Sequence, residues 1–151
     1  MKVNELRIGN YVGFKNRTNC YCEVVDLSFD GGVHIIRHWT DGLGWPEYDQ
    51  PEEIEDITGI PLTEEWLLKF GFVNGNKTYA NAFSLEVLQT DFYLRPCYAG
   101  GYYWGFNLEK VDDCEFNDAE PVISIHQLQN LYFALTGEEL TISERSKRQL
   151  N

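Results

Sequence analysis

The chain has 151 residues, 43% of them hydrophobic and 15% aromatic, a composition that excludes a disordered protein. Its 24 acidic and 12 basic residues give a net charge of −12, which disfavours direct binding to nucleic acid because phosphate contacts require clustered cations. No apolar run approaches the roughly 20 residues of a membrane-spanning helix. The N-terminus lacks the apolar core of an export signal, so we expect a cytoplasmic protein with reduced cysteines.

The first part of the chain has the pattern of a small curled β-sheet. Strands are predicted at 6–14 with a bulge at Gly9 and Asn10, at 21–27, at 33–39 after a tight turn at 30–32, and at 54–57 after a Gly-rich loop at 41–46. Short, strongly bent strands in this order favour an SH3-like barrel over residues 1–60.

Two cysteines and two histidines in this sheet have the order of zinc ligands, namely Cys20, Cys22, His34 and His38. Zinc fingers, however, have two to four residues between the cysteines and carry the second pair on a helix. His34 and His38 fall in a predicted strand, where four residues span roughly 13 Å. We expect Cys22 to face His34 across the turn as a packing neighbour. The sequence therefore predicts no metal site and no cofactor.

A short helix is predicted within residues 60–72. Thr63 is the expected N-cap, and the two glutamates that follow lie where the helix dipole favours carboxylates. Leu62 and Leu67 are spaced as a hydrophobic staple, and Gly71 supplies the residue that ends the helix.

Residues 72 to 117 have the pattern of an antiparallel meander. Strands are predicted near 77–79, 83–88, 92–98 and 102–108, with a hairpin turn at 99–101. Within the hairpin, alternation sends Tyr93, Arg95 and Cys97 to one face and Phe92, Leu94 and Pro96 to the other, so that a core can take only one set.

This hairpin is the strongest candidate for molecular recognition, because Arg95, Tyr102, Tyr103 and Trp104 are grouped on it. Exposed aromatic rings beside an arginine are the usual anchors of a protein interface and of a base-stacking pocket. The alternative is a small sheet whose two faces are both buried.

A helix is predicted within residues 124–140, which contain an N-cap, an apolar stripe and a glycine that ends the helix. Ser124 and Gln127 are spaced as a capping box, and Gly137 is the expected end. Ile123 and Leu128 are placed as a staple. The predicted core-facing stripe consists of Leu128, Leu131, Tyr132 and Leu135.

The polar side of the same helix is dense in His126, Gln127, Gln129 and Asn130, with His126 and Asn130 on one face. It is either a solvated face with capping duties or an amide-lined contact with a partner chain or a small polar ligand.

The chain shows no catalytic constellation. It has no phosphate-cradling glycine loop and no metalloprotease, hydrolase or dinucleotide motif. His126 begins a helix, whose dipole disfavours the charged imidazole. Two acidic patches, at 47–56 and 109–120, form a solvated surface or a docking face for a basic partner.

Three blocks of sequence, at 4–11 (NELRIGNY), 60–72 (IPLTEEWLLKFGF) and 126–140 (HQLQNLYFALTGEEL), resemble signatures of one family. It is a family of short uncharacterised proteins carried by gut-type bacteria and by their phages and mobile elements. The resemblance implies an accessory role in phage or mobile-element biology, and it supplies no catalytic residues.

Together these patterns predict an α+β protein, with an SH3-like sheet over 1–60, a helix–meander–helix part over 61–142 and a polar tail over 143–151. The predicted function is binding of a host or phage protein without catalysis, and a homo-oligomer is compatible with it. The alternative is a small-ligand binder such as a nucleotide-signal sponge, and an enzyme is the third choice. The residues expected to bind are Arg95, Tyr102, Tyr103, Trp104, His126 and Asn130. No membrane partner is expected.

Overall fold

The computed structural model describes residues 1–28, 32–39, 47–48, 53–75, 83–87, 90–99, 102–109 and 121–143. The side chains of β4, of β9 and of β8 other than Leu94 fall outside this description, as do those of residues 17–19, 39, 86 and 87. Antiparallel strands and two helices make up the described chain, which confirms the α+β class. Contacts divide it into two units, one of residues 1–61 with 124–139 and one of residues 62–123 with 140–149.

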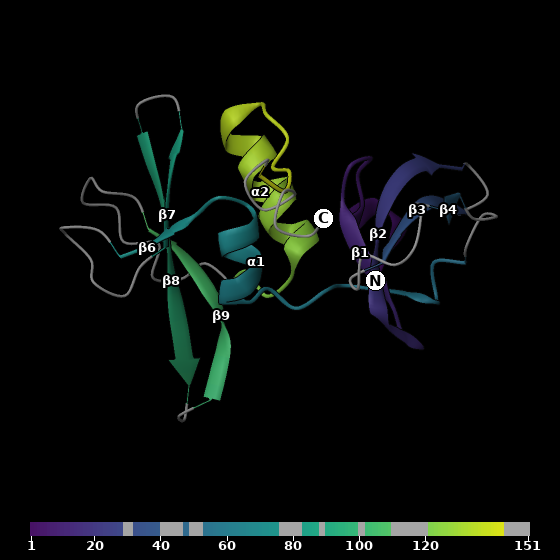
Figure 1. Cartoon of the computed structure of the whole chain (residues 1–151), viewed down its shortest axis with the longest axis horizontal. Helices are drawn as coiled ribbons and strands as arrows, with labels where there is room; N and C mark the ends of the chain where they lie inside the picture. Colours follow the sequence, from purple (N-terminus) through teal and green to yellow (C-terminus); the bar gives the residue numbers. More distant parts are fainter. Residues whose placement is uncertain are drawn as a thin grey trace. The chain divides into compact units, whose positions relative to one another are not determined.

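The first unit contains a five-stranded antiparallel sheet of order β4-β3-β2-β1-β5 (Figure 1). After the 3₁₀ helix η1 (Val3–Glu5), its strands are β1 (Tyr11–Phe14), β2 (Arg17–Leu27), β3 (Val33–Trp39), β4 (Glu47–Tyr48) and β5 (Ile57–Thr58). One face carries the core, which is formed by Leu6, Val12, Phe14, Cys22, Val24, Val33, Ile35 and Ile57. These positions alternate along each long strand, as a sheet with one apolar face requires.

Two predicted strands are shorter than expected. The first begins only at Tyr11, because Gly9 has a left-handed φ of 88° and the N–H of Asn10 turns back to the carbonyl of Arg7. The last begins at Ile57, since residues 54 to 56 form a turn. Residues 30, 31 and 41–46 of the predicted turn and loop lie outside the described residues.

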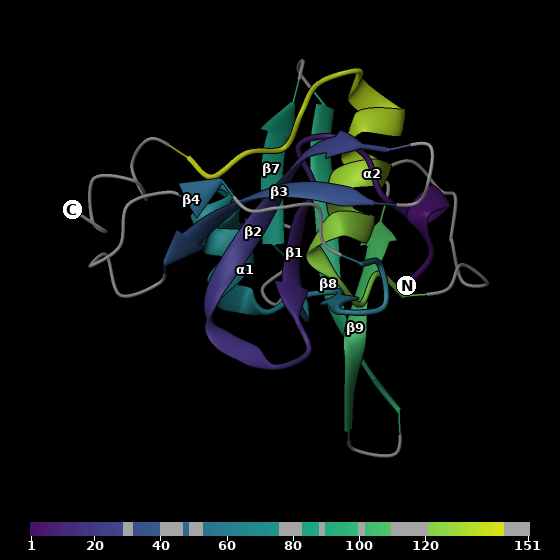
Figure 2. The same cartoon turned by 90° about the vertical axis from the view of Figure 1, so that its right-hand side faces the viewer.

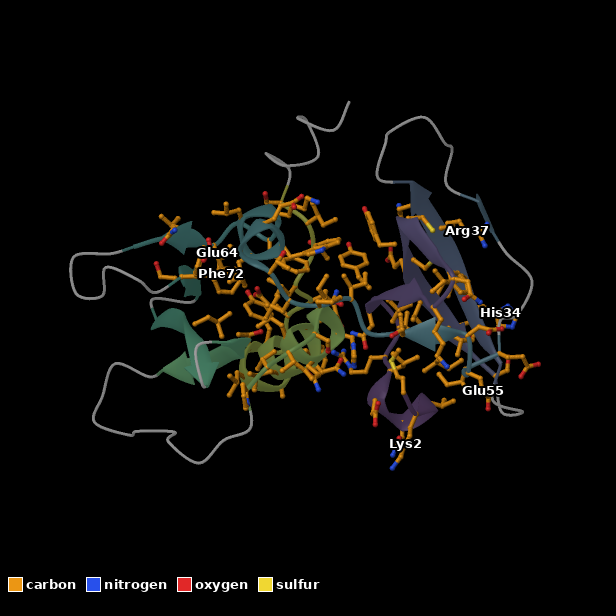
Figure 3. All side chains as sticks on the ribbon, turned by 90° about the horizontal axis from the view of Figure 1, so that it is seen from below. Lys2, His34, Arg37, Glu55, Glu64 and Phe72 are labelled. Atoms are coloured by element: carbon orange, nitrogen blue, oxygen red, sulfur yellow. The ribbon has the colours of Figure 1, made fainter. Side chains whose placement is uncertain are left out.

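The expected pairing of Cys22 with His34 is wrong. The β2–β3 ladder closes at Leu27 and Val33, so Cys22 lies opposite Arg37 and His34 opposite Asp26. His34 and Arg37 project from separate points along β3 (Figure 3). His38 stacks on Tyr21, with 4.9 Å between the ring centroids.

The second unit begins with helix α1 (Glu64–Lys69), whose predicted ends are confirmed. The Thr63 hydroxyl accepts a hydrogen bond from the Trp66 N–H at 3.4 Å, and Gly71 takes a φ of 93°. Leu62 and Leu67, the predicted staple, are both fully buried.

A four-stranded antiparallel sheet completes this unit, in the order β6-β7-β8-β9. Its strands are β6 (Val73–Asn74), β7 (Phe83–Val87), β8 (Thr90–Ala99) and β9 (Tyr102–Glu109), so three of the predicted meander strands are found. The predicted strand at 77–79 and the turn residues 100 and 101 lie outside the described residues. Leu94 and Phe83 are buried opposite one another in β8 and β7.

Helix α2 (Ile125–Thr136) has the predicted start and stop. The side-chain oxygen of Gln127 accepts from the Ser124 N–H at 3.2 Å, and Gly137 ends the helix with a φ of 75°. The predicted stripe is shifted, because Leu135 is 57% exposed and Leu131 is half-buried, while Ile123 is also exposed. The buried stripe is instead Ile125, Leu128, Gln129 and Tyr132. It packs on β1, which places α2 with residues 1–61.

Candidate functional site

The predicted binding residues fall in two different units. Arg95 lies in β8 opposite Asn107, and Tyr102 and Tyr103 lie in β9 opposite Ala99 and Tyr98. Trp104 is the extra residue of a β-bulge, since Cys97 pairs with Gly105 and the next residue of β8 pairs with Tyr103. Only the backbone of this set is described. His126 and Asn130 lie on α2.

The outer half of the β8–β9 hairpin is a two-stranded ribbon, which we define as residues 95–99 and 102–107. Strand β7 pairs with β8 only as far as Leu94, whereas the β8–β9 ladder continues to Ala99 and Tyr102. Among the described strands, β8 therefore has β9 as its single neighbour from residue 95 onward. The ends of β8 and β9 nearest the turn extend beyond α1 in both views (Figures 1 and 2).

Among the described strands, this ribbon consists of β8 and β9 alone, and it is rich in aromatic residues. A two-stranded hairpin alone is marginally stable in water, yet five aromatic residues occupy the ribbon, namely Tyr98, Tyr102, Tyr103, Trp104 and Phe106. The bulge at Trp104 adds local twist, and bulges commonly re-aim a side chain beside a functional site. The arrangement is suited to contact with another surface.

The polar side of α2 is used differently from the ribbon. Gln129 is fully buried. Its side-chain oxygen accepts the Tyr11 N–H at 2.7 Å and its side-chain nitrogen donates to the Gly9 carbonyl at 2.9 Å. One amide thus satisfies both a donor and an acceptor at the start of β1, as a buried amide must.

Asn130 and Asn10 extend the same cluster. The side-chain oxygen of Asn130 accepts from the side-chain nitrogen of Asn10 at 3.0 Å, and its own nitrogen donates to the Glu5 carbonyl at 2.8 Å. The oxygen of Asn10 accepts the Arg7 N–H at 2.9 Å. We call the side chains of Asn10, Gln129 and Asn130, with the backbone that they bind, the amide clasp.

An ion pair lies next to the clasp. Nη2 of Arg7 is 2.6 Å from Oε1 of Glu139, and the guanidinium lies 3.6 Å from the ring centroid of Phe133. Both charged groups are partly exposed, so the pair contributes at most about 1 kcal/mol. The contact nevertheless ties the segment before β1 to the end of α2.

His126 is buried at the first turn of α2, with 6% of its surface exposed. Its Nδ1 lies 3.1 Å from the Ser124 hydroxyl. A side chain at Gly59 would meet the imidazole, because a Cβ there would lie 3.0 Å from Cε1 of His126. Burial lowers the pKa of His126, and the carboxylate of Glu5 opposes that shift. The neutral imidazole is therefore the favoured form.

The contacts of α2 join the three signature blocks within the fold. The amide clasp connects block 4–11 to block 126–140. Block 60–72 reaches the start of α2 through the Ile125 N–H, which donates to the Ile60 carbonyl at 3.0 Å. Blocks 4–11 and 60–72 thus each contact the start or the buried side of α2.

The central role of Gln129 was not predicted, because the sequence pattern places this residue on the polar side of the helix. The available signal was its spacing, because Gln129 occupies the i+4 position of the stripe that starts at Ile125. A polar residue inside an apolar stripe predicts a buried polar contact.

No protein-family model, curated protein or solved structure matches the chain. In the described ranges, no three histidine, cysteine or acidic side chains are grouped as metal ligands. Neither described α-helix has the length and apolarity needed to cross a membrane.

Proposed function

We propose that this protein is a non-catalytic binding module that holds a protein partner on the β8–β9 ribbon. The observation that carries the proposal is the pairing pattern, in which β8 continues past the end of β7 and β9 is the one described strand beside it. A two-stranded hairpin is only marginally stable by itself. Contact with a partner would bury aromatic surface on it, which is favourable.

The composition of the ribbon supports a protein as the partner. Tyrosine, tryptophan and arginine are the residues that dominate the binding energy of protein interfaces, and the ribbon contains Tyr102, Tyr103, Trp104 and Arg95. The net charge of −12 favours a basic partner surface and disfavours nucleic acid.

The contacts of α2 narrow the set of proposed binding residues. Asn130 and His126 have hydrogen-bond partners inside the first unit, and that unit does not include the ribbon. We therefore rest the binding role on the four ribbon residues and assign the two α2 residues to the fold.

The wider setting of the protein is also a proposal. The three signature blocks support an accessory role in phage or mobile-element biology, for example in phage–host conflict in the cytoplasm. The SH3-like character of the first sheet is supported by strand order, because β5 returns to pair with β1.

The test begins with capture of the partner from the native host and its purification. Trp104→Ala and Tyr103→Ala are each expected to weaken the purified complex about 30-fold, the effect of losing an interface anchor worth roughly 2 kcal/mol. Isothermal titration calorimetry measures the change, and circular dichroism verifies that each variant is folded.

The matched controls are Leu68→Ala and Val73→Ala. Both residues are apolar and exposed, at 51% and 61%, and both lie in the second unit outside the ribbon. We expect these variants to bind within about threefold of the wild type. Equal affinities for all four variants would reject the ribbon as the binding site. Stabilisation by a nucleotide in a thermal melt, without a protein partner, would favour the small-ligand alternative.

A further inference from the structure

Among the described strands, β9 forms the longer outer edge of the second sheet. Seven of its eight residues pair with β8 on one side, Trp104 being the bulge residue, and no other described strand pairs with it. Unpaired N–H and C=O groups on such an edge form a template for a further strand. The opposite edge of the ribbon carries Pro96, which has no N–H and so opposes strand addition there.

Proline also fixes which groups of β9 point outward. Pro96 lies opposite Phe106, and without an N–H it cannot exchange the two bonds of a hydrogen-bonded antiparallel pair. Pairs alternate along such a ladder, so Phe106 turns its N–H and C=O away from β8. Leu108, two residues further along, does the same.

We propose that β9 pairs antiparallel with β9 of a second copy of this chain, giving one continuous sheet across a two-fold axis. The inference rests on the proposed function in treating the ribbon as a binding element, and it names a second copy as one partner. The second copy would bind the backbone edge of the ribbon, whereas the proposed protein partner would bind its side chains.

Charge argues for a second copy on this edge. The chain carries a net charge of −12, yet Glu109 is the one charged residue of β9 and lies at its end. With Phe106 at the two-fold axis, each Glu109 lies three residues from the axis, on opposite sides of it. The two Glu109 residues are then six residues apart along the ladder, or roughly 20 Å, well beyond the screening length of about 8 Å. The edge is therefore self-complementary, as a two-fold interface requires.

The test compares two substitutions at one position in the full chain. Phe106→Ala and Phe106→Pro both remove the ring, but only proline removes the outward N–H. Analytical ultracentrifugation over a dilution series should show a dimer for the wild type and for Phe106→Ala. The dimer of Phe106→Pro should dissociate at least about tenfold more readily, with an unchanged circular dichroism spectrum.

Amide hydrogen exchange of the wild type provides a second measurement that needs no variant. The N–H groups of Phe106 and Leu108 should exchange more slowly at high than at low protein concentration. Exchange that does not depend on concentration, or a monomeric wild type, would overturn the proposal. Equal loss of the dimer in both variants would also overturn it, since the ring and not the edge would then be responsible.

The two proposals fail in different ways. If Trp104→Ala leaves both the partner complex and the dimer intact, the proposed function is wrong and edge pairing stands. If Phe106→Pro binds the protein partner normally and the wild type is a monomer, edge pairing is wrong and the proposed function stands.

Discussion

Gln129 binds Tyr11 and Gly9, which precede it in the sequence by 118 and 120 residues. Its amide binds one backbone N–H and one backbone C=O at the start of β1. Burying a polar group without a hydrogen-bond partner costs free energy of folding. The two bonds of Gln129 therefore stabilise the contact between the start of the chain and α2. The neighbouring Asn130 binds two further sites in the same segment.

The clasp predicts a large loss of stability for Gln129→Leu. Leucine keeps the volume but removes the hydrogen bonds to the Tyr11 N–H and the Gly9 carbonyl, and removing the partner of a buried polar group costs about 1–3 kcal/mol. We expect the free energy of unfolding to fall by about 2–4 kcal/mol in urea denaturation. Gln127→Ala removes an exposed amide of the same helix and should cost about 1 kcal/mol or less. Similar small losses in both variants would show that the clasp is not a main source of stability.

His126 predicts that the protein is less stable in acid. Its pKa is lower in the folded than in the unfolded chain, where it has the ordinary value of 6.5. The unfolded state therefore binds a proton more readily, and stability rises with pH wherever that holds. The contribution of His126 is complete above pH 6.5 and is lost as the pH falls through the lowered pKa. Urea denaturation from pH 7.5 to 4.5 should show a smaller decline for His126→Gln, and identical slopes would contradict the prediction.

At the scale of elements, local signals predicted the helix ends and missed the buried face of α2. Thr63, Ser124, Gly71 and Gly137 act within one turn of themselves, so their roles could be read from adjacent residues. The stripe depends on what α2 packs against. The amide of Gln129 binds β1, and the buried face contains Ile125 and Gln129 in place of the predicted Leu131 and Leu135.

Most of the strand pairing that could be predicted lies at short turns, and the return of β5 to the first sheet is the exception. The β8–β9 hairpin follows from alternation and a glycine turn, whereas β4 and β6 have two residues each and carry too little pattern to be recognised. The binding residues show the same division. The ribbon aromatics could be grouped because they are close in sequence. The sequence could not show that His126 is buried or that Asn130 binds Asn10 and the Glu5 carbonyl, which lie far from it in the chain.

The element α2 should be indispensable to the first unit. Deleting residues 124–151 removes the partner of β1 and the amide clasp, so we expect β1 to β3 to lose amide protection in hydrogen exchange. Deleting only residues 144–151 is the control and should preserve protection. A synthetic peptide of residues 124–139 should restore it, and a Gln129→Leu peptide should do so less well. Full protection without residues 124–151 would contradict the expectation.

For the whole molecule, the chain alternates between its two units. It leaves the first unit after Pro61, returns at Ser124 and leaves again after Glu139. The outgoing and returning segments are paired, since Pro61 and Ser124 form a β-bridge and the Leu62 N–H donates to the Ile123 carbonyl at 3.0 Å. Composition could not reveal this alternation, because both units have the same mixture of strands and turns.

The alternation has a consequence for synthesis on the ribosome. The N-terminal sheet is translated long before its helix, with residues 62–123 made in between. At roughly 5–20 residues per second, that interval lasts about 3–12 seconds. Throughout it, the nascent sheet has no Gln129 to meet Tyr11 and Gly9, which makes it a natural client for a chaperone. The first unit can therefore complete its folding only after α2 has been synthesised.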